Sequence, residues 1–350
     1  MTHHPTPRAL ASGLAAAWLA LTSHSAWAQS GTVQLSGLVD VYAGAMKFAG
    51  DGQRRTTVGS NGMTTSWIGV TGTEELGGGL KAGFALTSFL RPTTGAQGRF
   101  DSDTFWSRDA NLSLSSSLGT VRLGRWMAPN FLPTVLFNAF GDSFTFSPLI
   151  LHANVPLFNG TQWVGTTQAD TGWGSQIAYT TPKLLGGLSA TLQYQLRDGG
   201  SSGKNYGGNL IYLNGPIGLT AFYERTQLSN PTVARYADGS SRTNWMLGGS
   251  YDLQAAKLYL TYGQSQNKVS NAKLKTASAS VLVPLGGAGK LRAAYAHTRN
   301  HLLNAKRQTL TLGYGYELSK RTDLYANVMH DKITRASSGT SYAVGLRHRF

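Results

Sequence analysis

Apolar residues alternate with uncharged polar residues along most of the chain. Every second residue from Leu188 to Leu196 is apolar, and the positions between them carry Ser, Thr and Gln. The segment from Leu310 to Leu318 shows the same period of two. This pattern is typical of β-strands that have one face in apolar surroundings and the other in water. Because no apolar stripe of helical period competes with it, the sequence predicts an all-β fold.

The predicted strands are joined by short turns and long polar connectors in alternation. Seven short turns, such as 75–79 and 214–216, alternate with eight long connectors, such as 90–104 and 197–204, so fifteen connectors join sixteen strands. An even strand number with short turns at one end is typical of transmembrane β-barrels, and a barrel of this size encloses a water-filled channel. We therefore expect one 16-stranded antiparallel barrel. A secreted β-sandwich or β-helix would alternate similarly but would not need its long loops at one end.

The first 28 residues have the features of a secretory signal peptide. A basic start is followed by an apolar run over 9–21 and by Ala26-Trp27-Ala28, which matches a cleavage site of the A-x-A type. The apolar run is too short to span a bilayer as a helix, which argues against a retained anchor. We expect a signal peptide over 1–28 and the barrel over 29–350. Loss of Arg8 lowers the formal net charge from +15 to +14.

Composition excludes several other classes of protein. Only 13% of the residues are charged, about half the share in soluble domains, which argues against a cytosolic enzyme. The chain has no Cys, so disulfides, thiolate zinc sites and cysteine nucleophiles are impossible. Its aromatic residues, 8 Trp, 15 Tyr and 13 Phe, argue against disorder.

One connector, approximately residues 127–172, is unusually long and apolar. Its only acidic residues are Asp142 and Asp170, and it contains no Lys or Arg. Long loops of this kind are usually functional, and one this apolar must pack against the barrel interior or a neighbouring subunit. We expect it to narrow the channel, with Asp142 facing the pore; the alternative is that Asp142 only caps the turn at 141–143.

Three arginines occupy positions whose side chains should point into the barrel. Arg122, Arg292 and Arg347 each have a parity opposite to that of their apolar neighbours, and an arginine facing lipid at mid-membrane would cost about 2–4 kcal/mol. They are candidate lumen residues. The alternative is that they line the wide vestibules or face periplasmic water and only make the wall more soluble.

Four segments resemble motifs of the Gram-negative general porins of β-proteobacteria. They are 72–82, 119–125, 318–325 and the last strand, 341–350, which ends in the terminal aromatic Phe350. The similarity covers 29–350. The resemblance implies a homotrimer of 16-stranded barrels with loop 3 folded into each lumen. It also implies a location in the outer membrane of a Gram-negative bacterium, among its lipid and lipopolysaccharide.

The resemblance also nominates residues of the channel constriction. Arg108 and Arg125 coincide with family arginines associated with the constriction. Trp67 and Thr71, in contrast, stand at lumen-facing positions where the family places cations. This chain therefore lacks some of the basic residues that the family places along the wall of the channel.

No pattern in the sequence points to catalysis. His330-Asp331 could be half of an acid/base pair, but no second pair or nucleophile elbow accompanies it, and the glycine-rich turns lack the Lys-Ser/Thr of a phosphate-binding loop. We expect no enzyme activity, no cofactor, no metal site and no nucleic-acid partner. The predicted function is passive diffusion of small hydrophilic solutes and ions with a preference for anions. The alternative is a pore selective for one solute class, such as organic acids or sugars.

Overall fold

The computed structural model describes residues 31–153, 157–158, 163–164, 171–196, 203–227 and 241–350. Within these ranges nearly all regular structure is β-strand, with two short helices, α2 (Phe131–Leu136) and α3 (Pro148–Ala153). The predicted signal peptide lies outside the described residues. The strands of the wall are β1 (Thr32–Met46), β3 (Trp67–Gly77), β4 (Leu80–Arg91), β6 (Asp109–Ser116), β7 (Gly119–Met127), β10 (Gly172–Thr180), β11 (Leu188–Gln195), β12 (Asn205–Asn214), β13 (Ile217–Thr226), β14 (Arg242–Asp252), β15 (Lys257–Asn267), β16 (Lys273–Leu285), β17 (Gly289–Asn300), β18 (Ala305–Glu317), β19 (Thr322–Ile333) and β20 (Gly339–Arg349).

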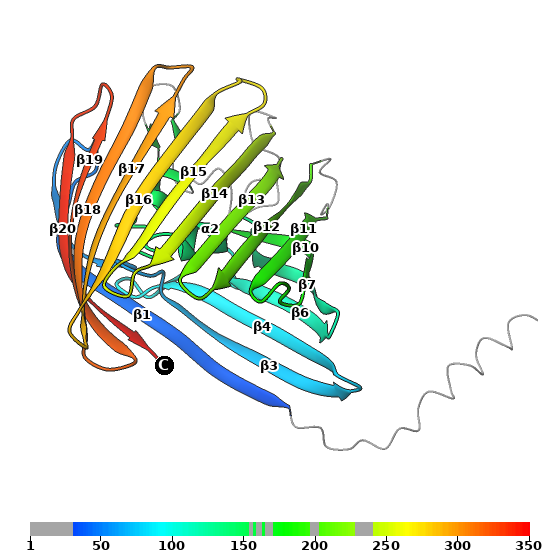
Figure 1. The fold of residues 1–350 in the computed structure, drawn as a ribbon. Helices are drawn as coiled ribbons and strands as arrows, with labels where there is room; N and C mark the ends of the chain where they lie inside the picture. Colours follow the sequence, from blue (N-terminus) through cyan, green and yellow to red (C-terminus); the bar gives the residue numbers. More distant parts are fainter. Residues whose placement is uncertain (1–30, 154–156, 159–162, 165–170, 197–202, 228–240) are drawn as a thin grey trace, which may run out of the picture.

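These 16 strands form one closed antiparallel sheet (Figure 1). Each strand pairs with its neighbours along the chain, and β1 closes the ring by pairing with β3 through 32–38 and with β20 through 38–45. Closure satisfies the backbone hydrogen bonds that an open sheet would leave unpaired in lipid. The prediction of a 16-stranded antiparallel barrel is confirmed.

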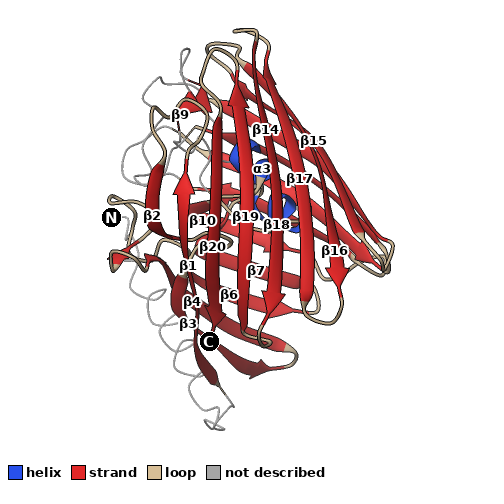
Figure 2. Cartoon of the chain, turned by 90° about the vertical axis from the view of Figure 1, so that its left-hand side faces the viewer, coloured by secondary structure: helices blue, strands red, loops and turns tan. Residues whose placement is uncertain are grey.

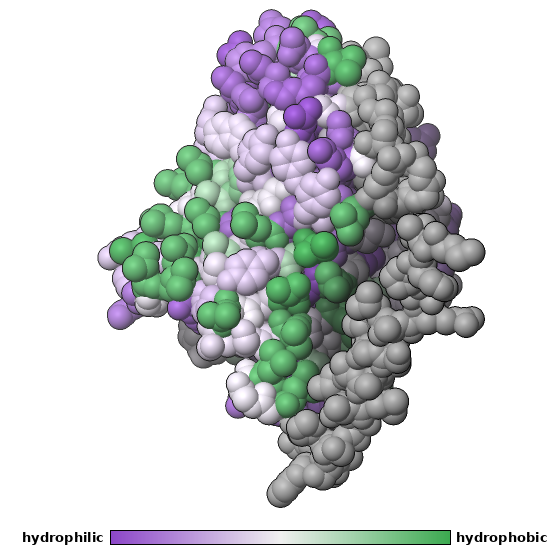
Figure 3. Space-filling model, turned by 90° about the vertical axis from the view of Figure 1, so that its right-hand side faces the viewer, coloured by the Kyte–Doolittle hydropathy of each residue, from purple (hydrophilic) through white to green (hydrophobic). Residues whose placement is uncertain are grey.

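The burial of side chains follows the sequence alternation. In β18 and β19 the odd-numbered residues are buried and the even-numbered residues are exposed over most of each strand. The exposed positions include Leu310, Leu312 and Val328, whereas the buried ones are largely polar, including Thr309 and Asn327. The apolar face therefore points outward. On the face that Figure 3 shows, hydrophobic residues gather over the middle and lower part, and hydrophilic residues gather at the upper end.

The two ends of the barrel differ as the connector lengths predict. Short turns close the lower end, and the turn between β3 and β4 uses Gly77, Gly78 and Gly79 at φ 86°, 59° and 79°, a conformation that favours glycine. The upper end carries the long connectors, and these contain structure that the alternation did not predict. Besides α2 and α3 they hold the short strands β2 (Arg55–Ser60), β5 (Ala96–Gln97), β8 (Leu157–Phe158) and β9 (Trp163–Val164).

The strand β2 shows how such a connector is used. It pairs with the upper half of β1 through residues 55–60, and so fixes the connector between β1 and β3 against the wall. In the part of the chain that the structure describes, no helix is long and apolar enough to cross a membrane.

Candidate channel constriction

The connector after β7 turns inward and packs against the inner face of the wall. Helix α2 contacts β13, and α3 contacts β16, β17 and β18. Figure 2 shows both helices within the ring of strands, and Figure 1 shows α2 inside it. We refer to the described residues 128–153 as the inner segment.

Aromatic side chains of the inner segment fill space that small wall residues leave open. Phe140, Phe146 and Leu151 are at most 4% exposed and belong to one apolar cluster with Tyr42, Met63, Tyr259, Tyr325 and Met329 of the wall and its connectors. The ring of Phe140 lies so close to Gly313 that a Cβ atom there would approach it to 2.9 Å. An inward-facing glycine thus marks a docking position of the inner segment.

Polar contacts fix both ends of the inner segment to the wall. At its start, the Asn130 and Asn244 amides donate hydrogen bonds of 2.9 and 3.1 Å to Oε1 of the buried Glu224. At its end, the two ring nitrogens of His152 lie 2.8 and 2.7 Å from the hydroxyls of Thr298 and Thr309. Both anchors join the loop to lumen-facing positions of the strands.

An ion pair behind His152 strengthens the second anchor. Arg307 donates to both oxygens of Asp331, at 3.0 and 3.1 Å, and to the carbonyl of Leu151 at 3.2 Å. Burial lowers the pKa of His152 well below its ordinary value of 6.5, and the nearby charges of Arg307 and His297 act in the same direction. His152 is therefore neutral at physiological pH.

Asp142 lies at the inner end of a chain of polar contacts. The Thr64 hydroxyl donates to Asp142 Oδ1 at 3.0 Å, and Arg347 Nη1 donates to the same hydroxyl at 2.7 Å. Arg347 also donates two hydrogen bonds to Asp323, at 3.0 and 3.1 Å. Burial raises the pKa of Asp142, while the Thr64 hydrogen bond and the charges of Arg347 and Arg108 oppose that rise.

A buried carboxylate on β1 positions Thr64, and the sequence analysis did not identify it. Asp40 is 0% exposed and accepts hydrogen bonds from the backbone N–H groups of Gly62, Met63 and Thr64, at 3.1, 2.8 and 2.8 Å. The Tyr325 hydroxyl also donates to it, at 2.6 Å. The single acid between Val39 and Val41 was the available signal, since its parity is inward.

Two arginines stack on indole rings along the same part of the inner wall. The guanidinium carbon of Arg108 lies 3.9 Å from the ring centroid of Trp67, and that of Arg122 lies 4.4 Å from that of Trp126. Asp109 lies 3.8 Å from Arg108 and accepts a 2.7 Å hydrogen bond from Thr87, and its charge also acts on Arg122. The structure thus brings Trp67 and Arg108 together, while Arg122 stacks on Trp126 of its own strand.

Arg125 occupies a different environment. Its Nε donates to the carbonyl of Ser107 at 2.7 Å, and its charge acts on Asp103, which also pairs with Arg99 at 2.7 Å. Arg125 is therefore held against the connector between β4 and β6. Its wall partner is Ala110, whose strand neighbours Leu112 and Leu114 are exposed on the outer face.

The remaining candidates lie nearer the lower end or at the chain terminus. Thr71 is half-buried on β3, opposite Ala85. Arg292, on β17, lies near the charges of Arg347 and Asp323. Phe350 exchanges backbone hydrogen bonds of 3.0 and 3.1 Å with Gly37 of β1, so it helps to close the barrel.

His330 and Asp331, which could have formed an acid/base pair, lie on opposite faces of the wall. His330 is exposed on the outer face and hydrogen-bonds Thr340 at 2.9 Å, whereas Asp331 is 0% exposed inside and bound to Arg307. Among the described residues, no group of three or more His, Asp and Glu side chains could hold a metal ion.

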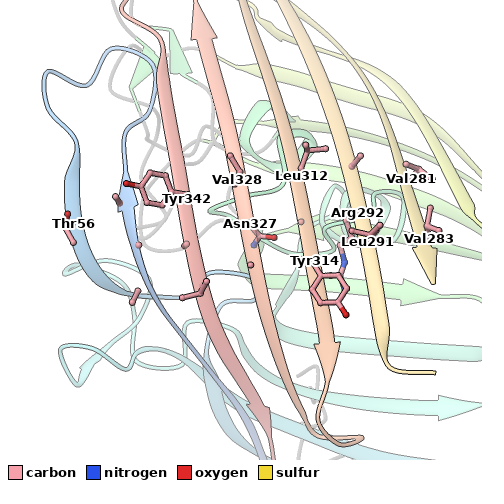
Figure 4. Close-up of a pocket in the computed structure, with 18 residues that line it drawn as sticks. Thr56, Val281, Val283, Leu291, Arg292, Leu312, Tyr314, Asn327, Val328 and Tyr342 are labelled. Carbon is pink, nitrogen blue, oxygen red and sulfur yellow. The ribbon is translucent and has the colours of Figure 1, made fainter. Parts of the chain in front are cut away.

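A hollow with a largely apolar lining lies outside the channel. It has a volume of about 910 Å³ and lies on the outer face of β16–β20 and β1 (Figure 4). Its lining includes Val281, Leu312, Val328 and Tyr342, which have outward parity. This hollow lies on the outer side of the wall, whereas the inner segment packs against the inner side.

A closed wall that is polar inside and apolar outside defines a transmembrane β-barrel channel. The family model described as Gram-negative porin matches residues 15–336. The chain is 30% identical over 358 residues to outer membrane porin protein 32 of Delftia acidovorans, covering 94% of this chain and 96% of that protein. The chain therefore belongs to the Gram-negative porin family, and it is an outer-membrane protein of a Gram-negative bacterium.

Solved structures agree with this assignment. The anion-selective porin from Comamonas acidovorans has 27% identity and a TM-score of 0.78, with 92% of this chain and all of that chain covered. OmpT of Vibrio cholerae, in a trimer form, shares the fold at 15% identity with a TM-score of 0.66, over 92% of this chain and all of that chain.

Proposed function

We propose that this porin forms a homotrimeric water-filled channel through which small hydrophilic solutes diffuse, with a preference for anions. The proposal rests mainly on how unequally the charges near the constriction are neutralised. Asp323 and Asp331 each accept two hydrogen bonds from an arginine, and Asp40 accepts four hydrogen bonds. Arg108, in contrast, keeps a side chain that is 33% exposed, and its ion pair with Asp109 is long, at 3.8 Å.

Stacking on the indole leaves the edge of the Arg108 guanidinium open. A cation held flat on an aromatic ring still directs its N–H groups outward in the plane of the group. The inner segment adds no Lys or Arg and only one acid, Asp142. In a narrow channel with low-dielectric walls such an excess of positive charge enriches anions. The anion selectivity named for the Comamonas acidovorans structure supports the same preference.

The reversal potential of single channels under a KCl gradient tests this proposal. We expect an anion-selective sign, and Arg108→Ala and Arg122→Ala should each move the potential toward zero. Arg321→Ala is the matched control, because Arg321 is exposed in a short turn outside the lumen. A cation-selective potential in the unmodified protein would refute the preference.

The stacked arginines also favour a second candidate, a pore selective for organic acids. A carboxylate can bind the guanidinium edge while the indole provides an apolar surface beside it. Liposome swelling distinguishes the two: rates that fall smoothly with solute size indicate a general pore, whereas saturation by one class of acid indicates a selective one. We further propose that the barrel has no catalytic activity, which is supported by the separation of His330 from Asp331.

A further inference from the structure

Arg125 lies close to the channel constriction, but the register of β7 gives it the parity of the outer face. Its partner is Ala110, and Leu112, two residues further along β6, is 67% exposed on the outer face. Arg122 lies three residues before Arg125 and has inward parity, because positions an odd number of residues apart in a strand point to opposite faces. The Arg125 guanidinium lies beside Gly172 at the start of β10, where a Cβ atom would approach Nη2 to 3.4 Å. Arg125 therefore does not stand beside Arg122 on the lumen face.

The side chain of Arg125 holds the backbone immediately before Arg108. Its Nε donates to the carbonyl of Ser107 at 2.7 Å. Two further hydrogen bonds join this stretch to the wall: the Phe89 N–H donates to Ser107 Oγ at 2.9 Å, and the Arg108 N–H donates to the Thr87 carbonyl at 3.2 Å. The bond from Arg125 is the shortest of the three. Ser107 is 1% exposed, so its carbonyl would be left buried without this donor, which is costly.

A buried carboxylate of the β4–β6 connector faces the same arginine. The Asp103 side chain is 0% exposed, and it accepts hydrogen bonds from Nε and Nη2 of Arg99 at 2.7 and 3.0 Å. The positive charge of Arg125 also acts on Asp103. Nη1 of Arg99 in turn donates to Thr171 Oγ1 at 3.3 Å. The charge of Arg125 is thus directed at the connector, and the connector is fixed to its own barrel.

The stacking of Arg108 depends on where this backbone stands. The indole of Trp67 is fixed because its residue pairs with Leu38 of β1 and Phe89 of β4. The Arg108 guanidinium carbon lies 3.9 Å from the ring centroid, which is van der Waals contact. A functional side chain keeps such a geometry only when its supporting residues hold it to within about 0.5 Å. A displacement of the Ser107 carbonyl would therefore move the guanidinium away from the ring.

We propose that Arg125 is a positioning residue, which determines the anion preference by holding the Ser107 carbonyl and so keeping Arg108 on Trp67. It does not act on permeating anions through its own charge. This inference rests on the proposed anion preference and on Arg108 as a source of it. It differs from the role that the family resemblance implies for Arg125, which is that of a residue in the constriction itself.

A comparison of lysine and alanine at position 125 separates positioning from charge. Lysine keeps the positive charge but has no guanidinium Nε–H to donate to the Ser107 carbonyl. We expect Arg125→Lys and Arg125→Ala to lower the ratio of anion to cation permeability alike, by about twofold, in reversal-potential measurements under a KCl gradient. Arg225→Lys is the matched control, since Arg225 has outward parity on β13 and donates to the Ser241 hydroxyl at 3.4 Å. A ratio in Arg125→Lys equal to that of the unmodified protein would overturn the proposal.

A double-mutant cycle tests whether Arg125 acts through Arg108. Once Arg108 is replaced by alanine, no guanidinium is left to position, so Arg108→Ala/Arg125→Ala should shift the permeability ratio no further than Arg108→Ala alone does. Additive shifts would show that Arg125 affects anions independently, and the proposal would then be wrong. Should Arg125→Ala fail to assemble, the same cycle with Arg125→Lys replaces it.

Hydrogen exchange tests the positioning without reference to selectivity. The amides of 107–109 should lose protection by about tenfold in both Arg125 variants, because each removes one buried hydrogen bond, and not in Arg225→Lys. Unchanged protection in Arg125→Lys would overturn the proposal. A cation-selective potential in the unmodified protein would refute the proposed anion preference, whereas loss of protection in the same preparation would still show that Arg125 holds this backbone.

Discussion

Asp142 is the only Asp, Glu, Lys or Arg of the inner segment, and its charge opposes that of Arg108 and Arg347. A carboxylate here lowers the local positive potential that anions experience. One oxygen of this carboxylate accepts a hydrogen bond from the Thr64 hydroxyl, and the oxygen of an amide can accept the same bond. Asparagine can therefore replace Asp142 with little change in structure. A substitution by asparagine therefore removes the charge and leaves the packing in place.

We expect Asp142→Asn to raise the ratio of anion to cation permeability about twofold, because one negative charge is lost at the constriction. Burial raises the pKa of Asp142 above its ordinary value of 3.8, so the unmodified carboxyl takes up a proton at a higher pH than an exposed aspartate does. The anion preference of the unmodified channel should accordingly increase as pH falls, and that of the variant should increase less, because it lacks this carboxyl. Reversal potentials between pH 7.5 and 4 measure both effects; an identical pH response in the two proteins would contradict this role.

Asp40 provides a second prediction at the scale of the residue. Asp40→Ala leaves three backbone N–H groups and the Tyr325 hydroxyl without their acceptor. We expect the free energy of local opening of residues 61–66 to fall by about 3 kcal/mol. Hydrogen exchange of these amides measures it, and Asp40→Asn, which keeps one acceptor, should lose less. Unchanged protection in the alanine variant would show that β2 alone fixes this connector.

The anchoring of α3 is a property of an element, because one histidine joins it to two strands. His152 is neutral in the folded protein, and its pKa lies well below 6.5, the ordinary value it would regain if α3 detached. A detached His152 would bind a proton below about pH 6.5 while the docked one would not. Detachment is therefore favoured progressively as pH falls below 6.5, by up to about 1.4 kcal/mol per pH unit.

Hydrogen exchange over 147–153, corrected for its intrinsic dependence on pH, should thus show weaker protection at pH 5 than at pH 7.5. His152→Gln retains hydrogen-bonding groups but does not titrate, so its protection should vary less with pH. The raised pKa of Asp142 acts in the opposite direction, since protonation favours its buried form; an Asp142→Asn background removes that contribution. Equal pH dependence with and without His152 would exclude the histidine as the cause.

At the scale of the whole molecule, the closure of the barrel and the charge of its lumen each lead to a prediction. A closed barrel whose backbone bonds are satisfied should migrate on gels with a heat-dependent mobility, and in mild detergent we expect a trimer. A monomer by light scattering, with detergent mass subtracted, would contradict the trimer.

The selectivity of the intact channel should also depend on salt. Charges on the lumen wall are screened beyond about 10 Å at 0.1 M and beyond about 3 Å at 1 M. We therefore expect the anion preference to weaken when the mean KCl concentration rises tenfold at a constant gradient. A preference independent of salt would indicate a binding site in the pore and would favour the channel for organic acids.

The sequence by itself determined the wall of this protein. Period-two alternation reports on every strand separately, because lipid on one side and water on the other act on each residue locally. Connector lengths then fixed the strand number, and parity placed Arg122, Arg292 and Arg347 on the inner wall. The glycines indicated the short turns for the same reason, since a left-handed backbone conformation is a local requirement.

Only the tertiary structure decided how the inner segment is held and which charges meet. The sequence separates Asp40 from Thr64 by 24 positions and from Tyr325 by 285, and no local pattern announces such contacts. His152 was not identified, because its partners Thr298 and Thr309 lie on strands that closure brings to the helix. The family resemblance nominated both Arg125 and Arg108, yet one is held by the β4–β6 connector and the other by Trp67. Contacts between segments far apart in the sequence determine these two environments, and the alternation of apolar and polar residues contains no information about such contacts.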